Sequence, residues 1–229
     1  STILVCGGAS GLGGATTEMI VAAGGKAVIL DININAGKAL TEQLGRQISY
    51  IRADATDAGQ VADAMAAIRR SGPLHGLVCT AGIAVAERVL PKEGVQPLDH
   101  FARVININLL GTFNVVRLAA AAMAANEPNP AGERGVIVMT ASVAAFDGQI
   151  GQAAYSASKK ATSSRIRSAS GCGTARAKAR ETSRTAPMQR SLPSSWARMC
   201  SRAAGSRVSC SCGVPVVHFE RSKPWILSL

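Results

Sequence analysis

Apolar residues in the first two thirds of the chain fall into short runs that alternate with longer mixed segments. The runs occupy residues 2–6, 26–31, 48–52, 76–80 and 135–140. They are rich in Val, Ile and Leu without regular polar alternation, as strands covered on both faces of a sheet are. The segments 12–23, 35–44 and 57–70 have helical length, and Gly24, Gly45 and Gly72 provide their stops. This alternation predicts an α/β fold, a Rossmann-like doubly wound parallel sheet.

A longer helix is expected after Pro97. Apolar and small residues recur there at helical spacing and form one stripe, which contains Phe101, Val104, Ile105, Thr112, Val115 and Val116. Asn108 is the one amide within this stripe. A polar side chain on an apolar helix face is a candidate for a functional role.

A glycine-rich loop joins the first predicted strand to the first helix. Gly7, Gly11 and Gly13 have the spacing G-x-x-x-G-x-G, with Ser10 and Leu12 beside them. Glycines at this position allow a tight turn and close approach of a pyrophosphate, which then meets the N-terminus of the helix. The alternative, a purely structural turn, stays open on these residues alone.

Two acidic residues follow neighbouring predicted strands. Asp31 ends the second strand, where a carboxylate accepts from the ribose hydroxyls of NAD and repels the 2'-phosphate of NADP. Asp54, with Ala55 beside it, closes the third strand and is a candidate partner for the adenine amino group. NAD is therefore the expected cofactor. Capping of the next helix is the alternative role for each acid.

A candidate catalytic set lies further along the chain. Tyr155 and Lys159 are four residues apart and share one face of a helix. A nearby lysine cation and an oxidised nicotinamide both favour phenolate, so Tyr155 could exchange the proton of an alcohol. Ser142 follows the fifth strand and could bind the substrate oxygen, and Asn108 could hold a water that links Lys159 to solvent. An exposed helix face is the alternative for the Tyr–Lys pair.

As a set, these residues resemble the short-chain dehydrogenase/reductase family. The family's T-G-x-x-x-G-x-G corresponds to residues 6–13, its helix asparagine to Asn108, its serine to Ser142 and its Y-x-x-x-K to Tyr155–Lys159. More narrowly, residues 81–86, 126–130 and 134–159 resemble the type II 3-hydroxyacyl-CoA dehydrogenases. This resemblance implies a homotetrameric enzyme that oxidises a 3-hydroxyacyl-CoA to the 3-ketoacyl-CoA with NAD.

The chain departs from the family pattern at two positions near the glycine loop. Cys6 replaces a threonine, and the segment 79–82 reads Cys-Thr-Ala-Gly where the family usually has N-N-A-G or N-C-A-G. Cys79 lacks the amide hydrogen bonds of that asparagine. The backbone of Thr80 and Gly82 is still expected to contact the cofactor.

The net charge of +11 is confined to the last third of the chain. Residues 1–159 carry 12 Lys and Arg against 12 Asp and Glu, whereas residues 160–229 carry 13 against 2. The second segment lacks helical or strand periodicity, so we expect a dehydrogenase domain over 1–159, incomplete without the family's later elements, and an aberrant or disordered basic tail. The leading hypothesis for the tail is translation in a shifted reading frame. The alternative is an Arg-rich segment that binds nucleic acid, although aromatic stacking positions are missing.

The remaining features of the sequence concern cellular location, metal binding and catalytic activity. No apolar run approaches the roughly 20 residues of a membrane-spanning helix, and no secretory leader is recognisable. Cytoplasmic location is therefore expected. The six cysteines and three histidines are scattered without metal-ligand spacing, so no metal site is expected. A cofactor-binding but catalytically inactive member of the family is the second functional hypothesis.

Overall fold

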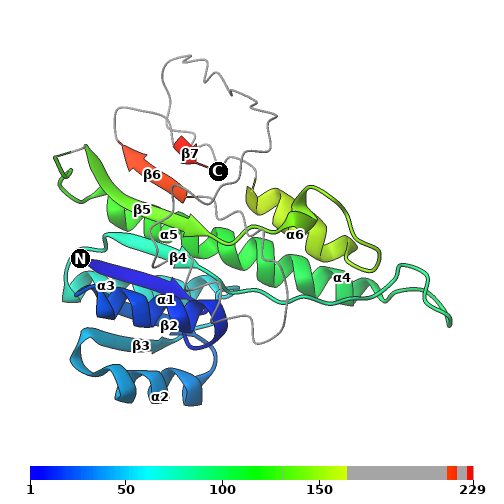
Figure 1. The fold of residues 1–229 in the computed structure, drawn as a ribbon, viewed down its shortest axis with the longest axis horizontal. Helices are drawn as coiled ribbons and strands as arrows, with labels where there is room; N and C mark the ends of the chain where they lie inside the picture. The colour runs from blue at the N-terminus through cyan, green and yellow to red at the C-terminus, as the bar shows by residue number, and fades with distance from the viewer. Residues whose placement is uncertain (131, 164–215, 221–225, 229) are drawn as a thin grey trace.

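The chain forms a sheet flanked by helices (Figure 1), and the computed structural model describes residues 1–130, 132–163, 216–220 and 226–228. The sheet has the strand order β3-β2-β1-β4-β5-β6-β7. Its strands are β1 (Thr2–Cys6), β2 (Lys26–Asp31), β3 (Ile48–Arg52), β4 (Gly76–Cys79), β5 (Glu133–Met139), β6 (Val216–Glu220) and β7 (Ile226–Ser228). β1 to β5 pair only in parallel with one another. The predicted Rossmann-like parallel sheet is thus confirmed.

Helices connect the parallel strands as crossovers. They are α1 (Gly11–Ala22), α2 (Ile34–Leu44), α3 (Ala58–Ser71), α4 (Leu98–Ile105) and α5 (Thr112–Ala124), and a further helix, α6 (Ala153–Ser163), follows β5. Short 3-10 turns occur at η1 (Gly45–Gln47) and η3 (Val143–Ala145). Asp57 begins α3 by accepting hydrogen bonds from the backbone N–H groups of Gly59 and Gln60, and Gly72 ends it with a positive φ of 133°. The boundaries of α3 therefore follow the capping residues of the sequence.

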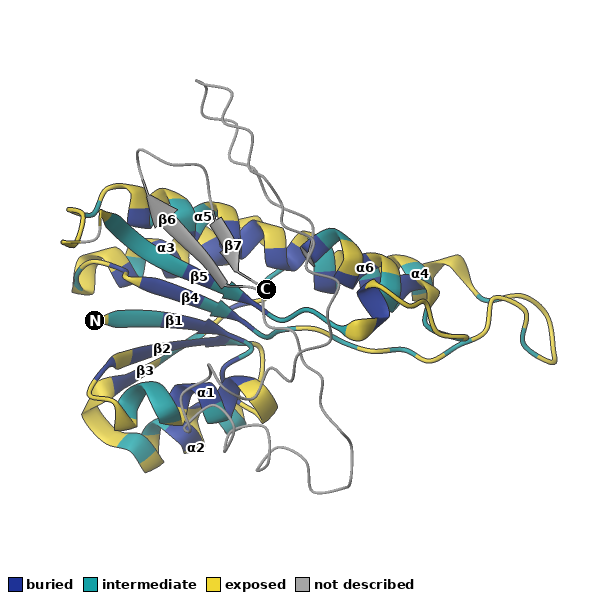
Figure 2. Cartoon of the chain, turned by 45° about the horizontal axis from the view of Figure 1, so that its top comes forward, coloured by how far each residue is buried: buried dark blue, intermediate teal, exposed yellow. Residues whose placement is uncertain are grey.

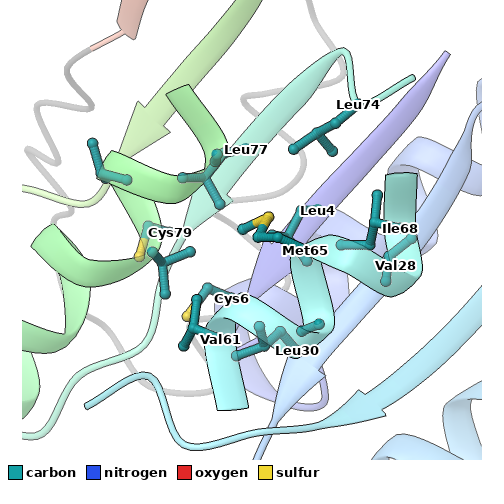
Figure 3. Close-up of a cluster of buried hydrophobic side chains, with 14 of the residues drawn as sticks. Leu4, Cys6, Val28, Leu30, Val61, Met65, Ile68, Leu74, Leu77 and Cys79 are labelled. Carbon is teal, nitrogen blue, oxygen red and sulfur yellow. The ribbon is translucent and has the colours of Figure 1, made fainter. Parts of the chain in front are cut away.

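The two faces of the sheet bury separate hydrophobic clusters, because alternate residues of a strand point to opposite faces. Leu4, Cys6, Val28 and Leu30 face α3 and α5, where Val61, Met65 and Ile68 pack on them (Figure 3). Ala27 and Ile29 face the other way and pack with Leu40 of α2. Figure 2 shows the resulting pattern, in which the central strands are buried between two layers of helices. Covering both faces explains why these strands lack polar alternation.

The predicted long helix after Pro97 is confirmed, and it contains an irregular turn. α4 and α5 are joined by the π-helical segment η2 (Asn106–Gly111) into one continuous helix. By length and hydropathy, Leu98–Ala124 is the one described helix that could cross a membrane, with 44% of its most apolar window buried. Its residues Val104, Val115 and Val116 are buried in this fold, and a core helix passes the same test.

Two short strands are described in the segment after Lys159, where the sequence predicted no regular element. β6 pairs antiparallel with β5, and β7 pairs antiparallel with β6. β6 has the sequence Val-Val-His-Phe-Glu, whose β-branched and aromatic residues favour a strand once the edge of β5 offers unpaired backbone groups. Residues 160–163 of the predicted tail form the end of α6, and its remaining residues lie outside the described part of the chain.

Candidate active site

The predicted site residues gather at the carboxyl edge of the parallel sheet. Because β1 to β5 run the same way, the segments that follow them meet along one edge. The glycine loop follows β1, Asp31 ends β2, Asp54 and Ala55 follow β3, and Thr80 and Gly82 follow β4. Ser142 follows β5, and Asn108, Tyr155 and Lys159 come from helices. Residues as far apart in the chain as Gly7 and Lys159 are thus placed around one edge of the sheet.

The glycine loop is packed so tightly at Gly7 and Gly13 that side chains would not fit there. An added Cβ at Gly13 would lie 1.9 Å from the carbonyl oxygen of Gly7, and one at Gly7 would lie 2.7 Å from the backbone nitrogen of Ala81. Gly7 and Gly11 have φ of 77° and 54°, a region that L-residues rarely adopt. Ser10 is the N-cap of α1 without a side-chain capping bond, and Leu12 is half exposed. The loop therefore leaves the first-turn N–H groups of α1 for an anion, which fits a pyrophosphate.

Thr80 holds the glycine loop through hydrogen bonds, a role for which Cys79 lacks the amide group. Its hydroxyl donates to the carbonyl oxygens of Cys6 (2.9 Å) and Gly7 (3.3 Å), and its backbone N–H also donates to Cys6 (2.9 Å). Cys6 and Cys79 are register partners in β1 and β4, and both thiols are buried. The hydrogen bond with Cys79, together with burial, raises the pKa of the Cys6 thiol. The two buried thiols therefore pack against each other between β1 and β4, and Thr80 fixes the loop.

Asp31 contacts the glycine loop directly. Its Oδ2 accepts from the backbone N–H of Ala9 at 3.1 Å, and its Oδ1 accepts from that of Asn33 at 2.9 Å. Tyr50 donates its hydroxyl to the Asp31 carbonyl oxygen at 3.0 Å. The carboxylate is thus held beside the loop that would bind the pyrophosphate, as the ribose of a dinucleotide requires. It does not cap α2, because Asn33 does so.

Asn108 links three elements. Its Oδ1 accepts from the backbone N–H of Ile83, and its Nδ2 donates to the carbonyl oxygen of Ile83, both at 2.8 Å. Nδ2 also lies 3.2 Å from Oγ of Ser158, which itself donates to the carbonyl oxygen of Tyr155 at 2.7 Å. An added Cβ at Gly82 would approach Asn108 Oδ1 to 3.1 Å. Asn108 therefore positions both the segment after β4 and the helix that carries Tyr155, while its predicted water-holding role stays a prediction.

Lys159 lies on α6 one turn after Tyr155, and its side chain is directed to the end of β5. Its Nζ donates to the carbonyl oxygen (3.1 Å) and the hydroxyl (3.2 Å) of Thr140, and lies 5.7 Å from the centre of the Tyr155 ring. Burial lowers the pKa of Lys159. Oγ of Ser142 accepts from the backbone N–H of Ala144 at 3.2 Å, and its hydroxyl hydrogen donates to no described residue. That hydrogen is available for a substrate oxygen.

The segment between β4 and α4 is tied to the approach to α6. The backbone N–H of Glu87 donates to the carbonyl oxygen of Gly151 at 2.8 Å, and the Glu87 carboxylate lies 2.9 Å from Nδ1 of His100. The hydrogen bond to Glu87 raises the pKa of His100. Protonated His100 therefore strengthens a contact that borders the site. Among the described residues, no group of three or more His, Cys, Asp or Glu could hold a metal ion.

Sequence reasoning missed three supporting residues. Thr140 could have been found as a polar residue between the end of β5 and Ser142. Ser158 and Asn114 carry no such signal, because their partners Asn108 and Ala55 are 50 and 59 residues away in the chain.

Comparison with known proteins shows extensive similarity to one group. A family model described as short chain dehydrogenase matches residues 1–171. The chain is 50% identical over 159 residues to 3-hydroxyacyl-CoA dehydrogenase type-2 of Bos taurus, covering 68% of this chain and 61% of that protein. The Homo sapiens protein of the same name is 48% identical with the same coverage. A crystal structure of 3-hydroxyacyl-CoA dehydrogenase type-2 from Mycobacterium avium is similar with a TM-score of 0.66 and 40% identity, covering 71% of this chain and 64% of that one. The match thus spans less than two thirds of the length of these relatives.

Proposed function

Because the chain belongs to the short-chain dehydrogenase family of oxidoreductases, we propose that it uses NAD to interconvert a secondary alcohol and a ketone. The observation that carries the proposal is the arrangement of Tyr155 and Lys159 at the carboxyl edge of the sheet. Lys159 is anchored on Thr140 and lies beside the Tyr155 ring. An exposed helix face, the alternative for this pair, would not bury the lysine, which is only 7% exposed.

The residues that would hold the cofactor form a continuous band along this edge. Gly7, Gly11 and Gly13 would accommodate the pyrophosphate, Asp31 the adenine ribose, and the 54–55 backbone the adenine. Thr80 and Gly82 would border the nicotinamide half. A bound nicotinamide would supply the hydride acceptor or donor. The carboxylate of Asp31 beside the glycine loop favours NAD over NADP, because it would repel a 2'-phosphate.

The chain's own groups would handle the proton and the developing charge. Ser142 would donate its hydroxyl hydrogen to the substrate oxygen and orient the alcohol. Tyr155 would take the alcohol proton at its phenolic oxygen, with the Lys159 ammonium group held beside its ring. Thr140 and Asn108 would maintain this geometry, one by holding the lysine and the other by holding α6 through Ser158.

We further propose that the substrate is a 3-hydroxyacyl-CoA and the product the 3-ketoacyl-CoA. The support is the name shared by the bovine, human and mycobacterial relatives, at 40 to 50% identity. The second candidate is a cofactor-binding protein without turnover. It is favoured by the coverage of these relatives, 61 to 64% of their length, and by the abrupt change in charge after Lys159.

The deciding experiment follows NADH oxidation with a short 3-ketoacyl-CoA and NAD binding by calorimetry in the same preparation. We expect Tyr155→Phe to abolish turnover and to leave NAD binding intact. Ser156→Ala is the matched control, because its buried hydroxyl on the same helix has no hydrogen-bond partner among the described residues. Binding without turnover in the unsubstituted chain establishes the second candidate. Absence of NAD binding refutes both.

For the segment from Lys160 onward, which follows the proposed 1–159 dehydrogenase domain, we propose translation in a shifted reading frame. The support is its excess of basic residues, 13 against 2 acidic ones, and its lack of family motifs. The nucleotide sequence around codons 159–161 tests this, and an uninterrupted frame with no family-like alternative translation would refute it. Nucleic-acid binding by the tail is the competing explanation, and failure of the chain to retain DNA or RNA at any salt concentration would exclude it.

Assembly and compartment are proposed on family grounds. A homotetramer is the expected assembly if the chain retains its subunit contacts, and a monomer in sedimentation would contradict it. Cytoplasmic location fits the two buried, unpaired thiols of Cys6 and Cys79, since reduced cysteines persist in reducing compartments.

A further inference from the structure

The segment that follows β3 is fastened to α5 by one buried side chain. Asn114, which is 7% exposed, donates its Nδ2 to the carbonyl oxygen of Ala55 at 2.9 Å. Its Oδ1 accepts from Nε (3.1 Å) and Nη2 (2.7 Å) of Arg117, one turn further along α5. The amide thus bridges an exposed guanidinium and the backbone at the edge of the sheet.

The orientation of this amide is fixed by the chemistry of its partners. A guanidinium only donates, so it must face the amide oxygen, and a carbonyl oxygen only accepts, so it must face the amide nitrogen. Reversing the amide would lose all three hydrogen bonds at once. Asn114 therefore holds the Ala55 carbonyl in one direction.

The neighbouring contacts make the 54–56 segment a defined turn. Oδ1 of Asp54 accepts from the backbone N–H and the hydroxyl of Thr56, both at 2.8 Å. Gly111, at the end of η2, leaves room for Ala55, because an added Cβ would lie 3.4 Å from the Ala55 Cβ. The 54–56 turn is thus held by its own hydrogen bonds and packs against the helix at Gly111. Asn114 attaches the turn to α5 through a hydrogen bond.

We propose that Asn114 is a positioning residue for the adenine end of the cofactor, acting through the backbone and carboxylate of residues 54–55. This inference rests on the proposed NAD-dependent function. Asn114 itself lies behind the turn, so it would fix the shape of the adenine pocket without touching the ligand. Substitution of Asn114 should then weaken binding of the adenosine half of NAD and leave binding of the nicotinamide half unchanged.

The test uses the full chain with the variants Asn114→Asp and Asn114→Ala. Asn114→Asp keeps the shape and the Arg117 contact and replaces the donor by an acceptor that repels the Ala55 carbonyl. We expect adenosine monophosphate and NAD to bind about fivefold to tenfold more weakly, as loss of one hydrogen bond implies, with nicotinamide mononucleotide binding unchanged. Hydrogen exchange of the Thr56 amide without any ligand should quicken.

Asn126→Asp is the matched control. Asn126 also donates its Nδ2 to backbone carbonyl oxygens, those of Leu74 and Arg134, but Leu74 precedes β4 and Arg134 lies at the start of β5, at the amino edge of the sheet. This control should reduce stability and leave the ratio of the two mononucleotide affinities unchanged. An Asn114→Asp protein that binds both mononucleotides as the unsubstituted chain does, or loses both equally, overturns the inference. An unsubstituted chain that binds no NAD refutes the proposed function and this inference with it.

Discussion

Replacement of Gly13 by alanine tests whether close packing, and not only backbone freedom, requires the glycines of the loop. The added Cβ would lie 1.9 Å from the Gly7 carbonyl oxygen and 2.7 Å from Oγ1 of Thr80. Gly7 has little room to retreat, because its N–H donates to the carbonyl oxygen of Leu30 and Ala81 lies against its Cα. The neighbouring Gly14 provides the control, since its nearest contact would be 3.7 Å away.

The two substitutions should have opposite effects on the free energy of unfolding. Both residues lie in α1, where alanine is favoured over glycine by about 1 kcal/mol. Gly14→Ala should gain most of this amount. Gly13→Ala meets backbone atoms, and forcing extra volume into a packed site costs about 1–3 kcal/mol. Because the gain in helix propensity is common to both variants, we expect them to differ by the steric cost, about 1–3 kcal/mol.

Urea unfolding followed by circular dichroism measures this difference, and calorimetry with NAD measures its effect on the site. We expect Gly13→Ala to unfold at lower urea and to lose NAD binding, because the loop must move to admit the methyl group. Gly14→Ala should unfold at higher urea and bind NAD as before. Equal urea midpoints for the two variants, with NAD binding retained in both, would refute the steric reasoning.

Three further substitutions probe other contacts of the site. Thr80→Val removes the hydroxyl that supports the Cys6 carbonyl, and should lower the unfolding free energy by about 1 kcal/mol in urea titrations; an unchanged midpoint contradicts the assigned support. Asp31→Ala removes the charge that would repel a 2'-phosphate, so the preference for NAD over NADP should fall by about tenfold or more in paired titrations. Glu87→Gln should lower the pKa of His100 in an NMR titration. Because Glu87 raises the pKa of His100, the stabilisation from this pair is complete below the unfolded pKa of 6.5 and is lost as pH rises through the folded pKa. An unchanged His100 titration in the variant argues against the pairing.

Much of the candidate site was predictable because its residues follow strands in a regular order. The apolar runs at β1, β2 and β3 gave the strand positions, and a parallel sheet brings their carboxyl ends to one edge. Glycine spacing and the helical spacing of Tyr155 and Lys159 are local properties, so they can be recognised without coordinates. The supporting contacts are not local, and the sequence gives no indication of them.

The antiparallel strand β6 likewise could not be predicted from local sequence. Its residues have strand propensity, but a short strand forms only where another strand offers unpaired backbone groups. β5 is that partner, and it lies more than 70 residues earlier in the chain. Local periodicity therefore did not predict β6, because this strand depends on pairing with a distant segment of the chain.

The sequence by itself determined the order of strands through β5, the glycine loop and the positions of the acid, serine, tyrosine and lysine that follow these strands. Tertiary structure alone decided how these groups are held: Lys159 on Thr140, Asn108 on Ile83 and Ser158, Asn114 on Ala55, and Thr80 beneath the glycine loop. The physical reason is that hydrophobic periodicity is a property of residues close together in the sequence. The partner of a buried polar group is instead set by the tertiary contacts that the sheet creates between distant segments.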